Sequence, residues 1–316
     1  MHRLSFILVL ALSACFSCAG PAHAPEDYES ILAFLFEHMA DEDDAQLVAA
    51  VENLEAWLQD SDQISEALFG FQIDPRADSA VDGVDEVDRD ASNLLGLSFA
   101  RKSPHLTATL AETLTAANYS DIAKEYSPAV KTHEQWFTPE DTGCFATKEC
   151  TWIEADNQVT STWDFLGDAV TTERLQYRWI ETTLGWVFLR RSWLLEPSPN
   201  SGVDLLAQYQ MNVIMPQAGL TNAAVDPGVM GVASGLQEGA TEVFEELQTV
   251  LCGPGALRLE AHWMKIEYII PLTDEYALEL AMTSAKSNAE ALDAWILAEE
   301  GAPPAAATGT DDTVCE

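Results

Sequence analysis

Six cysteines carry the most distinctive chemistry of the 316-residue sequence. A thiol can be acylated, can bind a metal ion, or can pair with a second thiol in an oxidising compartment. Two of the six, Cys15 and Cys18, follow directly after an apolar run near the start of the chain. The other four lie far along the chain at Cys144, Cys150, Cys252 and Cys315. The position of each thiol therefore decides which of these reactions is open to it.

The first cysteine ends a segment that has the layout of an export signal. Arg3 precedes an apolar run over residues 4–14, which is too short to span a bilayer and has the length of a signal-peptide core. The run ends in Leu12-Ser13-Ala14-Cys15: an aliphatic residue, two small residues and a cysteine. This pattern resembles the lipobox of bacterial lipoproteins. The alternative is an ordinary signal peptide with an incidental cysteine.

The lipobox resemblance implies a cellular location for the protein. It implies that residues 1–14 are a lipoprotein signal peptide, that the Cys15 thiol carries a diacylglycerol, and that the mature chain starts at Cys15. Residues 15–26, with small side chains and two prolines, then read as a tether. Phe16 rather than aspartate follows the anchor, which in that family favours the outer membrane. We therefore expect a protein of the cell envelope, held at the membrane by its acyl chains.

Export would also place the remaining cysteines where disulfides persist. Cys144 and Cys150 flank a short loop and can pair locally, and Cys252 and Cys315 then pair by elimination. Cys18 is left over; if it were the anchor instead, the remaining four would pair evenly. No Cys-x-x-Cys pair lies in the mature body and no histidine stands at ligand spacing from Cys144 or Cys150, so these thiols predict no metal site and no cofactor.

The charge of the chain excludes some partners. Fifteen lysines and arginines face 52 aspartates and glutamates, a formal charge of −37, which repels nucleic acid and anionic lipid headgroups. Adaptation to salt, solubility and binding of divalent cations are the three interpretations. The densest acidic loop, residues 78–90, is a weak calcium candidate because EF-hand spacing is not met. Its candidate ligands are Asp82, Asp85, Asp88 and Asp90.

No catalytic motif stands out. The sequence contains no Gly-x-Ser-x-Gly elbow, no His-Glu-x-x-His pair and no phosphate-binding glycine loop. A hydrolytic triad built on one of the histidines stays an alternative, because triads assemble in space rather than in sequence. We expect no catalytic residues, and the sequence leaves enzymatic activity open.

Aromatic and basic residues gather on neighbouring expected strands. Four aromatic side chains could line an apolar cavity, the alternative being ordinary core packing. They are Trp163, Tyr177, Trp179 and Trp193. Four arginines in the same expected hairpin could receive an anionic ligand group, or could pair with the surplus carboxylates. They are Arg174, Arg178, Arg190 and Arg191.

The elements that must position these residues predict an α+β fold. Helical spacing of apolar residues dominates 27–130, with two helices within 27–59. Alternation with frequent turn signals over 131–216 predicts an antiparallel meander of about five or six strands, with a hairpin turn at Asp156-Asn157. Within 172–182, Arg174, Gln176 and Arg178 are expected on a solvated face of the strand. Residues 217–300 read as a helix over 229–251, a β-hairpin or strand, and a closing helix packed on the sheet. For 276–284 a strand is favoured over a helix start. Residues 301–316 form a low-complexity acidic tail, expected to be flexible.

Three functions remain open at this point. The first is a lipid-anchored envelope protein that binds an apolar ligand or a protein partner without catalysis. The order of elements resembles helix-grip or cone-shaped α+β folds, in which a curved sheet wraps a helix, but a fold does not determine a function. The second is a structural or interaction module of the envelope without a ligand site. The third is a hydrolase with a spatially assembled site.

Overall fold

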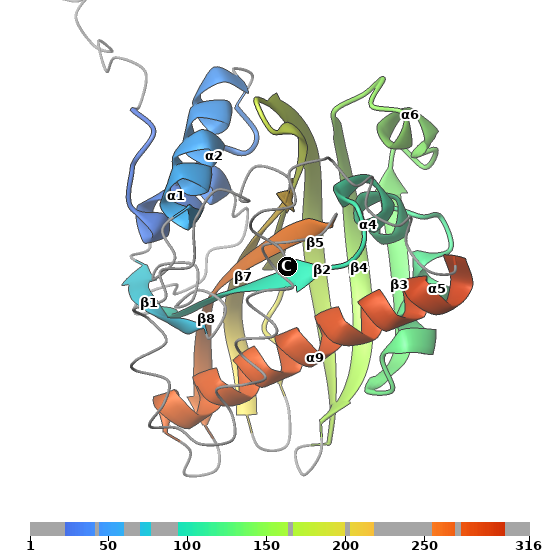
Figure 1. The fold of residues 1–316 in the computed structure, drawn as a ribbon. Coiled ribbons are helices and arrows are strands. Elements are labelled where there is room, and N and C mark those ends of the chain that lie inside the picture. Colours follow the sequence, from blue (N-terminus) through green and yellow to red (C-terminus); the bar gives the residue numbers. More distant parts are fainter. Residues whose placement is uncertain are drawn as a thin grey trace, which may run out of the picture.

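One antiparallel sheet forms the centre of the protein. The structure is a computed structural model that describes residues 23–41, 44–59, 70–76, 94–163, 167–199, 203–217, 255–268 and 273–300. The sheet has eight strands in the order β1-β2-β8-β7-β6-β5-β4-β3 (Figure 1). The strands are β1 (Phe71–Arg76), β2 (Leu94–Ser103), β3 (Val130–Thr138), β4 (Trp152–Trp163), β5 (Gly167–Thr182), β6 (Gly185–Leu194), β7 (Val203–Pro216) and β8 (Ala256–Tyr268). The helices are α1 (Tyr28–His38), α2 (Asp44–Leu58), α4 (Thr107–Leu114), α5 (Tyr119–Tyr126), α6 (Gly143–Ala146) and α9 (Asp274–Glu300).

The expected α+β class is confirmed, but the sheet is larger than the expected five or six strands and the helices are placed differently. β1 and β2 come from the region that was expected to be mainly helical. β2 pairs with β8, so that Phe99 lies opposite Glu260. A pairing between segments so distant in sequence leaves no local signal, which is why the sequence pattern missed it.

α1 and α2 cover one face of the sheet, which we call the outer face. The Asp27 side chain accepts a hydrogen bond from the Ser30 backbone N–H at 2.9 Å and thereby caps the start of α1. Apolar residues at helical spacing, such as Ile31, Leu35 and Leu54, are fully buried against this face. The two helices expected within residues 27–59 are therefore present.

Two arginines of the sheet fix α1 in place. Arg178 donates to the Met39 carbonyl and makes an ion pair with Asp44, and Arg191 donates to the Phe36 carbonyl. The Phe36 carbonyl lies in the last turn of α1 and the Met39 carbonyl at its C-cap, where the helix supplies no further N–H donors. Because both guanidinium groups are buried, they satisfy the helix end and bind it to the sheet at the same time.

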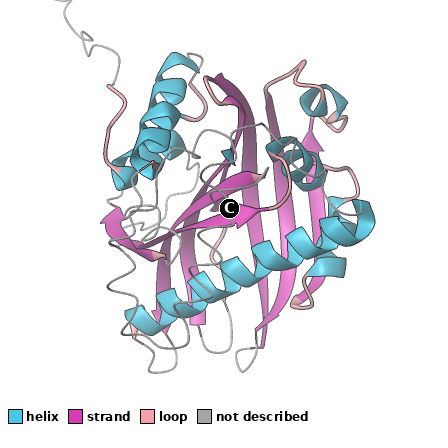
Figure 2. Ribbon diagram, in the orientation of Figure 1, coloured by secondary structure: helices cyan, strands magenta, loops and turns pink. Residues whose placement is uncertain are grey.

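The opposite face, which we call the inner face, is covered by α4, α5, α6 and the long helix α9, which crosses it diagonally (Figure 2). Residues 276–284 belong to α9 and not to the strand that was favoured for them. Leu278, Leu292 and Ile296 lie at helical spacing and are buried. α9 is also tied to the end of β2, where Ser103 Oγ donates to Asp293 Oδ1 at 2.7 Å and Arg101 pairs with Glu290 at 2.6 Å.

One of the two expected hairpin turns is present, and the other is replaced by a continuous strand. β5 and β6 are joined at Gly185, whose φ of 105° is a conformation that favours glycine. Asp156 and Asn157, expected to form a second turn, lie instead inside the continuous strand β4. Asp156 accepts a hydrogen bond from Arg174 on the neighbouring strand at 2.9 Å, which holds the segment extended.

The expected Cys144–Cys150 disulfide is present, with Cys144 inside α6 and Cys150 beyond its end. Several other sequence-based predictions lie outside the described residues. These are the anchor Cys15, the leftover Cys18, the Cys252–Cys315 pair, the calcium candidates Asp82, Asp85, Asp88 and Asp90, and a helix over 229–251. None of the described helices combines the length and the apolar character needed to cross a membrane.

Candidate functional site

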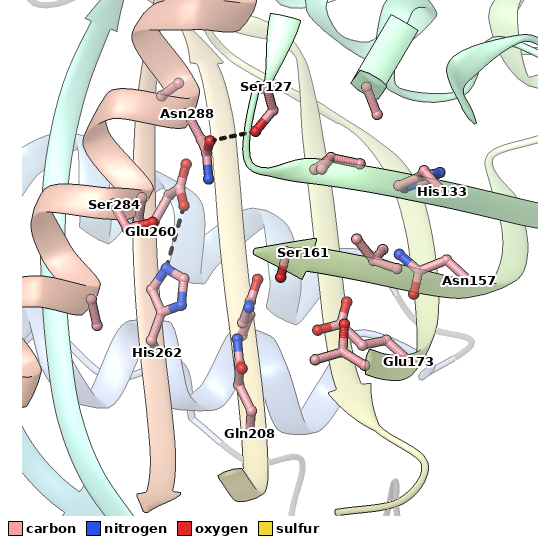
Figure 3. A pocket seen from close by; sticks show the side chains of 18 of the residues that line it. Ser127, His133, Asn157, Ser161, Glu173, Gln208, Glu260, His262, Ser284 and Asn288 are labelled. Carbon is pink, nitrogen blue, oxygen red and sulfur yellow. Dashed lines mark hydrogen bonds and ion pairs between the residues drawn. The ribbon is translucent and has the colours of Figure 1, made fainter. Parts of the chain in front are cut away.

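A cavity of about 380 Å³ lies between the inner face of the sheet and helices α5 and α9 (Figure 3). Its polar lining includes Tyr119, Tyr126, Ser127, His133, Asn157, Ser161, Glu173, Arg190, Gln208, Gln210, Arg258, Glu260, His262, Ser284 and Asn288. Its apolar lining includes Leu114, Ala123, Leu175, Leu205, Met264, Ile266, Leu280, Ala281, Ala285, Ala289 and Leu292. The cavity therefore offers both apolar surface and ionisable groups to whatever enters it.

One side of the cavity carries a charged network on β8. Glu260 accepts from His262 Nε2 at 3.3 Å and from Arg258 Nη2 at 3.3 Å. Burial alone would raise the pKa of Glu260, but the His262 hydrogen bond and the Arg258 charge outweigh it and the pKa is lowered. Both Glu260 oxygens are thus engaged by neighbours on the same strand.

The other side carries Glu173 on β5, with Asn157 opposite it on β4 (Figure 3). Burial raises the pKa of Glu173, and the Arg190 charge offsets only part of that effect. The Asn157 side chain is buried and its Oδ1 has no hydrogen-bond partner within the described ranges. This side of the cavity therefore holds a carboxyl group whose pKa is raised.

Arg190 lies on β6, between these two sides. Its Cα is paired with that of Tyr177 on β5 and with that of Asn212 on β7. Burial disfavours its charge, but Tyr177, Tyr119, Glu173 and Glu260 act in the opposite direction and the pKa of Arg190 is raised. The guanidinium group therefore remains charged, and its Nε has no hydrogen-bond partner in the described part of the chain.

His133 and two tyrosines complete the site near α5. The hydroxyls of Tyr119 and Tyr126 are 2.9 Å apart, and His133 Nδ1 lies 3.2 Å from Ser120 Oγ. Burial, with the charges of Arg190 and Lys124, lowers the pKa of His133 to about 4. A histidine with so low a pKa is a weak general base, so the Ser120–His133 contact gives little support to the hydrolase alternative.

The aromatic residues expected to line a cavity lie elsewhere. Tyr177 and Trp179 are buried in the inner-face core, where Tyr177 accepts from Gln135 at 3.0 Å and Trp179 donates to the Phe145 carbonyl at 3.0 Å. Trp193 is buried on the outer face. The side chain of Trp163 lies outside the described residues. The three placed rings are packed in the core, and the cavity is lined by other residues of the same sheet.

The four arginines of the expected hairpin divide between the two faces. Arg174, Arg178 and Arg191 point to the outer face, where each has carboxylate or carbonyl partners. Arg178 and Gln176 were expected on a wet face but are buried beneath α1 and α2. Arg190 alone reaches the cavity. The ion-pair interpretation thus fits three of them, and the ligand interpretation is open for the fourth.

Sequence reasoning missed the charged lining on β8 and β5. Arg258, Glu260 and His262 alternate with apolar residues, a pattern typical of a strand with one solvated face. That face is covered by α9 rather than by bulk solvent. Among the described residues, no group of three or more histidine, cysteine, aspartate or glutamate side chains could hold a metal ion.

Comparisons with known proteins do not identify the chain. No family model matches the sequence, and no curated protein matches it. A START superfamily protein from Mycobacterium smegmatis is similar with a TM-score of 0.33 and 10% sequence identity, over 63% of this chain and 94% of that chain. The structure of Ara h 8.0201 is similar with a TM-score of 0.31 and 11% identity, over 65% of this chain and 99% of that chain.

Proposed function

We propose that the protein binds a small organic ligand with a substantial apolar part in the cavity between the inner face and α9. The observation that supports this most directly is the cavity itself, whose volume of about 380 Å³ falls in the range of small-molecule sites. Its walls combine aliphatic side chains with a few ionisable groups, the mixture that gives both affinity and orientation. Catalysis is not needed to account for this arrangement.

Filling the cavity tests this function. Ala285 is a half-buried cavity-lining residue of α9, and Ala285→Trp would place an indole in the ligand's volume. We expect saturable binding of a neutral apolar probe, N-phenyl-1-naphthylamine, to the unmodified protein, followed by its fluorescence. The variant should bind at least about tenfold more weakly, a loss of roughly 1.4 kcal/mol.

Ser287→Trp is the matched control, because Ser287 lies on the same helix, is exposed and does not line the cavity. It should bind the probe as the unmodified protein does. Circular dichroism would verify that both variants are folded. Equal probe binding by the two variants would contradict a ligand site in this cavity.

We further propose that the protein acts at the cell envelope, held by a lipid on Cys15. The lipobox pattern Leu12-Ser13-Ala14-Cys15 after an apolar leader supports this anchor. In a bacterial host fed a palmitate analogue, Cys15→Ser should abolish both labelling and recovery in the membrane fraction. Cys18→Ser should leave both unchanged. If Cys15→Ser still incorporated the palmitate analogue, the lipid would be attached elsewhere, and the proposed location at the cell envelope would lose its support.

A further inference from the structure

We propose that the ligand is an organic acid whose carboxylate is bound by Arg190 while its apolar body lies against the aliphatic lining of the cavity. This inference rests on the proposed function and names the class of molecule that the site accepts. It follows from hydrogen-bonding capacity that the protein itself leaves unused at the centre of the inner face.

The first observation is the state of Arg190. Its Nε is buried and makes no hydrogen bond within the described ranges, and the carboxylates of Glu173 and Glu260, which line the same cavity, act on its charge without a direct ion pair among the described residues. A guanidinium group away from bulk water is costly unless its N–H groups find acceptors. Its planar set of donors matches the two oxygens of a carboxylate. An acceptor-bearing ligand would therefore satisfy Arg190 where the chain does not.

The second observation is that the unused groups beside Arg190 are mainly donors. Among the described residues, Arg258 Nε and Asn212 Nδ2 also have no hydrogen-bond partner, against one unused acceptor of the cavity lining, Asn157 Oδ1. In the Tyr119–Tyr126 pair one hydroxyl donates to the other, which leaves the second O–H free to donate. A site with surplus hydrogen-bond donors favours a ligand that carries hydrogen-bond acceptors, and a carboxylate is a strong acceptor.

The carboxyl groups of the cavity do not reverse this preference. Glu260 is already engaged by Arg258 and His262. Glu173 would be the site for a cationic ligand, but burial raises its pKa and disfavours its charge, and the Arg190 charge already acts on it. An amine would also meet the Arg190 charge within the same cavity. The arrangement therefore favours an anionic over a cationic ligand group.

The rest of the lining fits an apolar body. Met264, Ile266 and Leu280 extend the cavity beneath the first half of α9. Leu175, Ala289 and Leu292 line it nearer the second half. A molecule with one carboxylate and a flexible hydrocarbon part would place its charge at the central strand β6 and bury the remainder against these residues.

Three probes of equal chain length test the charge preference: decanoate, decanol and decylamine. Isothermal titration calorimetry with the mature chain should show decanoate binding at least about tenfold more tightly than decanol, as expected for a charge-assisted hydrogen bond. Decylamine should bind more weakly than decanol. Arg190→Met, which keeps the length of the side chain, should bind decanoate and decanol equally.

Thermal unfolding provides a second measurement for Arg190→Met. Because Arg190 makes no direct hydrogen bond or ion pair with the described residues, its removal should lower the unfolding midpoint less than Arg191→Met does, since Arg191 donates to Gln176 and to the Phe36 carbonyl. Arg174→Met removes the same charge from the outer face and serves as the control. It should keep the preference for decanoate.

The outcomes separate the two proposals. If decanol binds as tightly as decanoate and Ala285→Trp weakens both, the ligand site stands and the carboxylate assignment falls. A preference for decanoate that survives Arg190→Met would overturn the role of Arg190. Tighter binding of decylamine would assign the site to Glu173 instead. If none of the three probes binds, the ligand-binding function falls and this inference with it.

Discussion

At the scale of single residues, Arg190 and Arg191 show how one step along a strand separates two roles. Arg191 points to the outer face and donates to the Phe36 carbonyl and, at 2.6 Å, to Gln176. Arg190 points to the inner face and has no such partner among the described residues. Burial lowers the pKa of Arg191 to about 10, yet the group remains charged at neutral pH. One arginine therefore stabilises the fold and the other is available to a ligand.

His133 gives a prediction about pH. Burial, with Arg190 and Lys124, lowers its pKa from 6.5 to about 4, so between these values the unfolded chain binds more protons than the folded one. The free energy of unfolding should therefore fall as pH drops through this window. His133→Gln should reduce the loss of stability between pH 7 and pH 4 by up to about 3 kcal/mol, measured by urea denaturation.

Thr132 provides the comparison, since it is the exposed neighbour of His133 on β3. Thr132→Gln removes no ionisable group and should leave the pH dependence close to that of the unmodified protein. If both variants behaved alike, His133 would have to be accessible to protons in the folded state, contrary to its position behind α5.

At the scale of elements, the attachment of α1 to the sheet depends on buried arginines. Arg191→Met would leave the Phe36 carbonyl and the Gln176 side chain without their donor. We expect the free energy of unfolding to fall by about 2–3 kcal/mol, the cost of hydrogen bonds to a charged group. Arg174→Met, which breaks a half-exposed pair with Asp156, should cost less than about 1 kcal/mol in the same urea titration. Similar losses for the two variants would contradict this account.

The elements that could be predicted are those whose signal is local. The helices α1 and α2 follow from apolar spacing and the Asp27 cap, and the β5–β6 hairpin follows from alternation and Gly185. The start of α9 could not be predicted, because the stretch from Tyr276 to Ser284 alternates like a strand. Its helical stripe becomes visible only when Leu278, Leu292 and Ile296 are considered together. β2 could not be predicted either, because its strand character depends on pairing with β8, which lies far away in the sequence.

The candidate site was predictable only in part. The arginine cluster that contains Arg190 could be recognised in the sequence as a possible anion-binding group. Alternation with a period of two assigns side chains to the two faces of a sheet, but it does not tell which face is covered by a helix. Only the position of α9 turns the polar residues Arg258, Glu260 and His262 from a solvated surface into a cavity wall. The pairing of β5 with β6 likewise decides that Trp193 lies opposite Arg174, on the outer face.

At the scale of the whole molecule, a charge of −37 must oppose the compact state. Salt shortens the range of this repulsion, from a screening length of about 10 Å at 0.1 M to about 3 Å at 1 M. We expect the midpoint of thermal unfolding to rise between these NaCl concentrations, by about 2–4 °C for each 1 kcal/mol of relieved repulsion. KCl at equal ionic strength should have the same effect. A midpoint that fell with salt would show that the ion pairs outweigh the repulsion.

The sheet also separates the entry of the chain from the cavity. Ala24 is buried against the outer face, and the Pro25 carbonyl accepts from Asn53 of α2 at 2.7 Å, so the backbone that leads into α1 runs along that side. The sheet thus separates the side on which the chain enters α1 from the side that holds the cavity. A preparation immobilised on a sensor surface through its amino terminus should take up decanoate as readily as one free in solution.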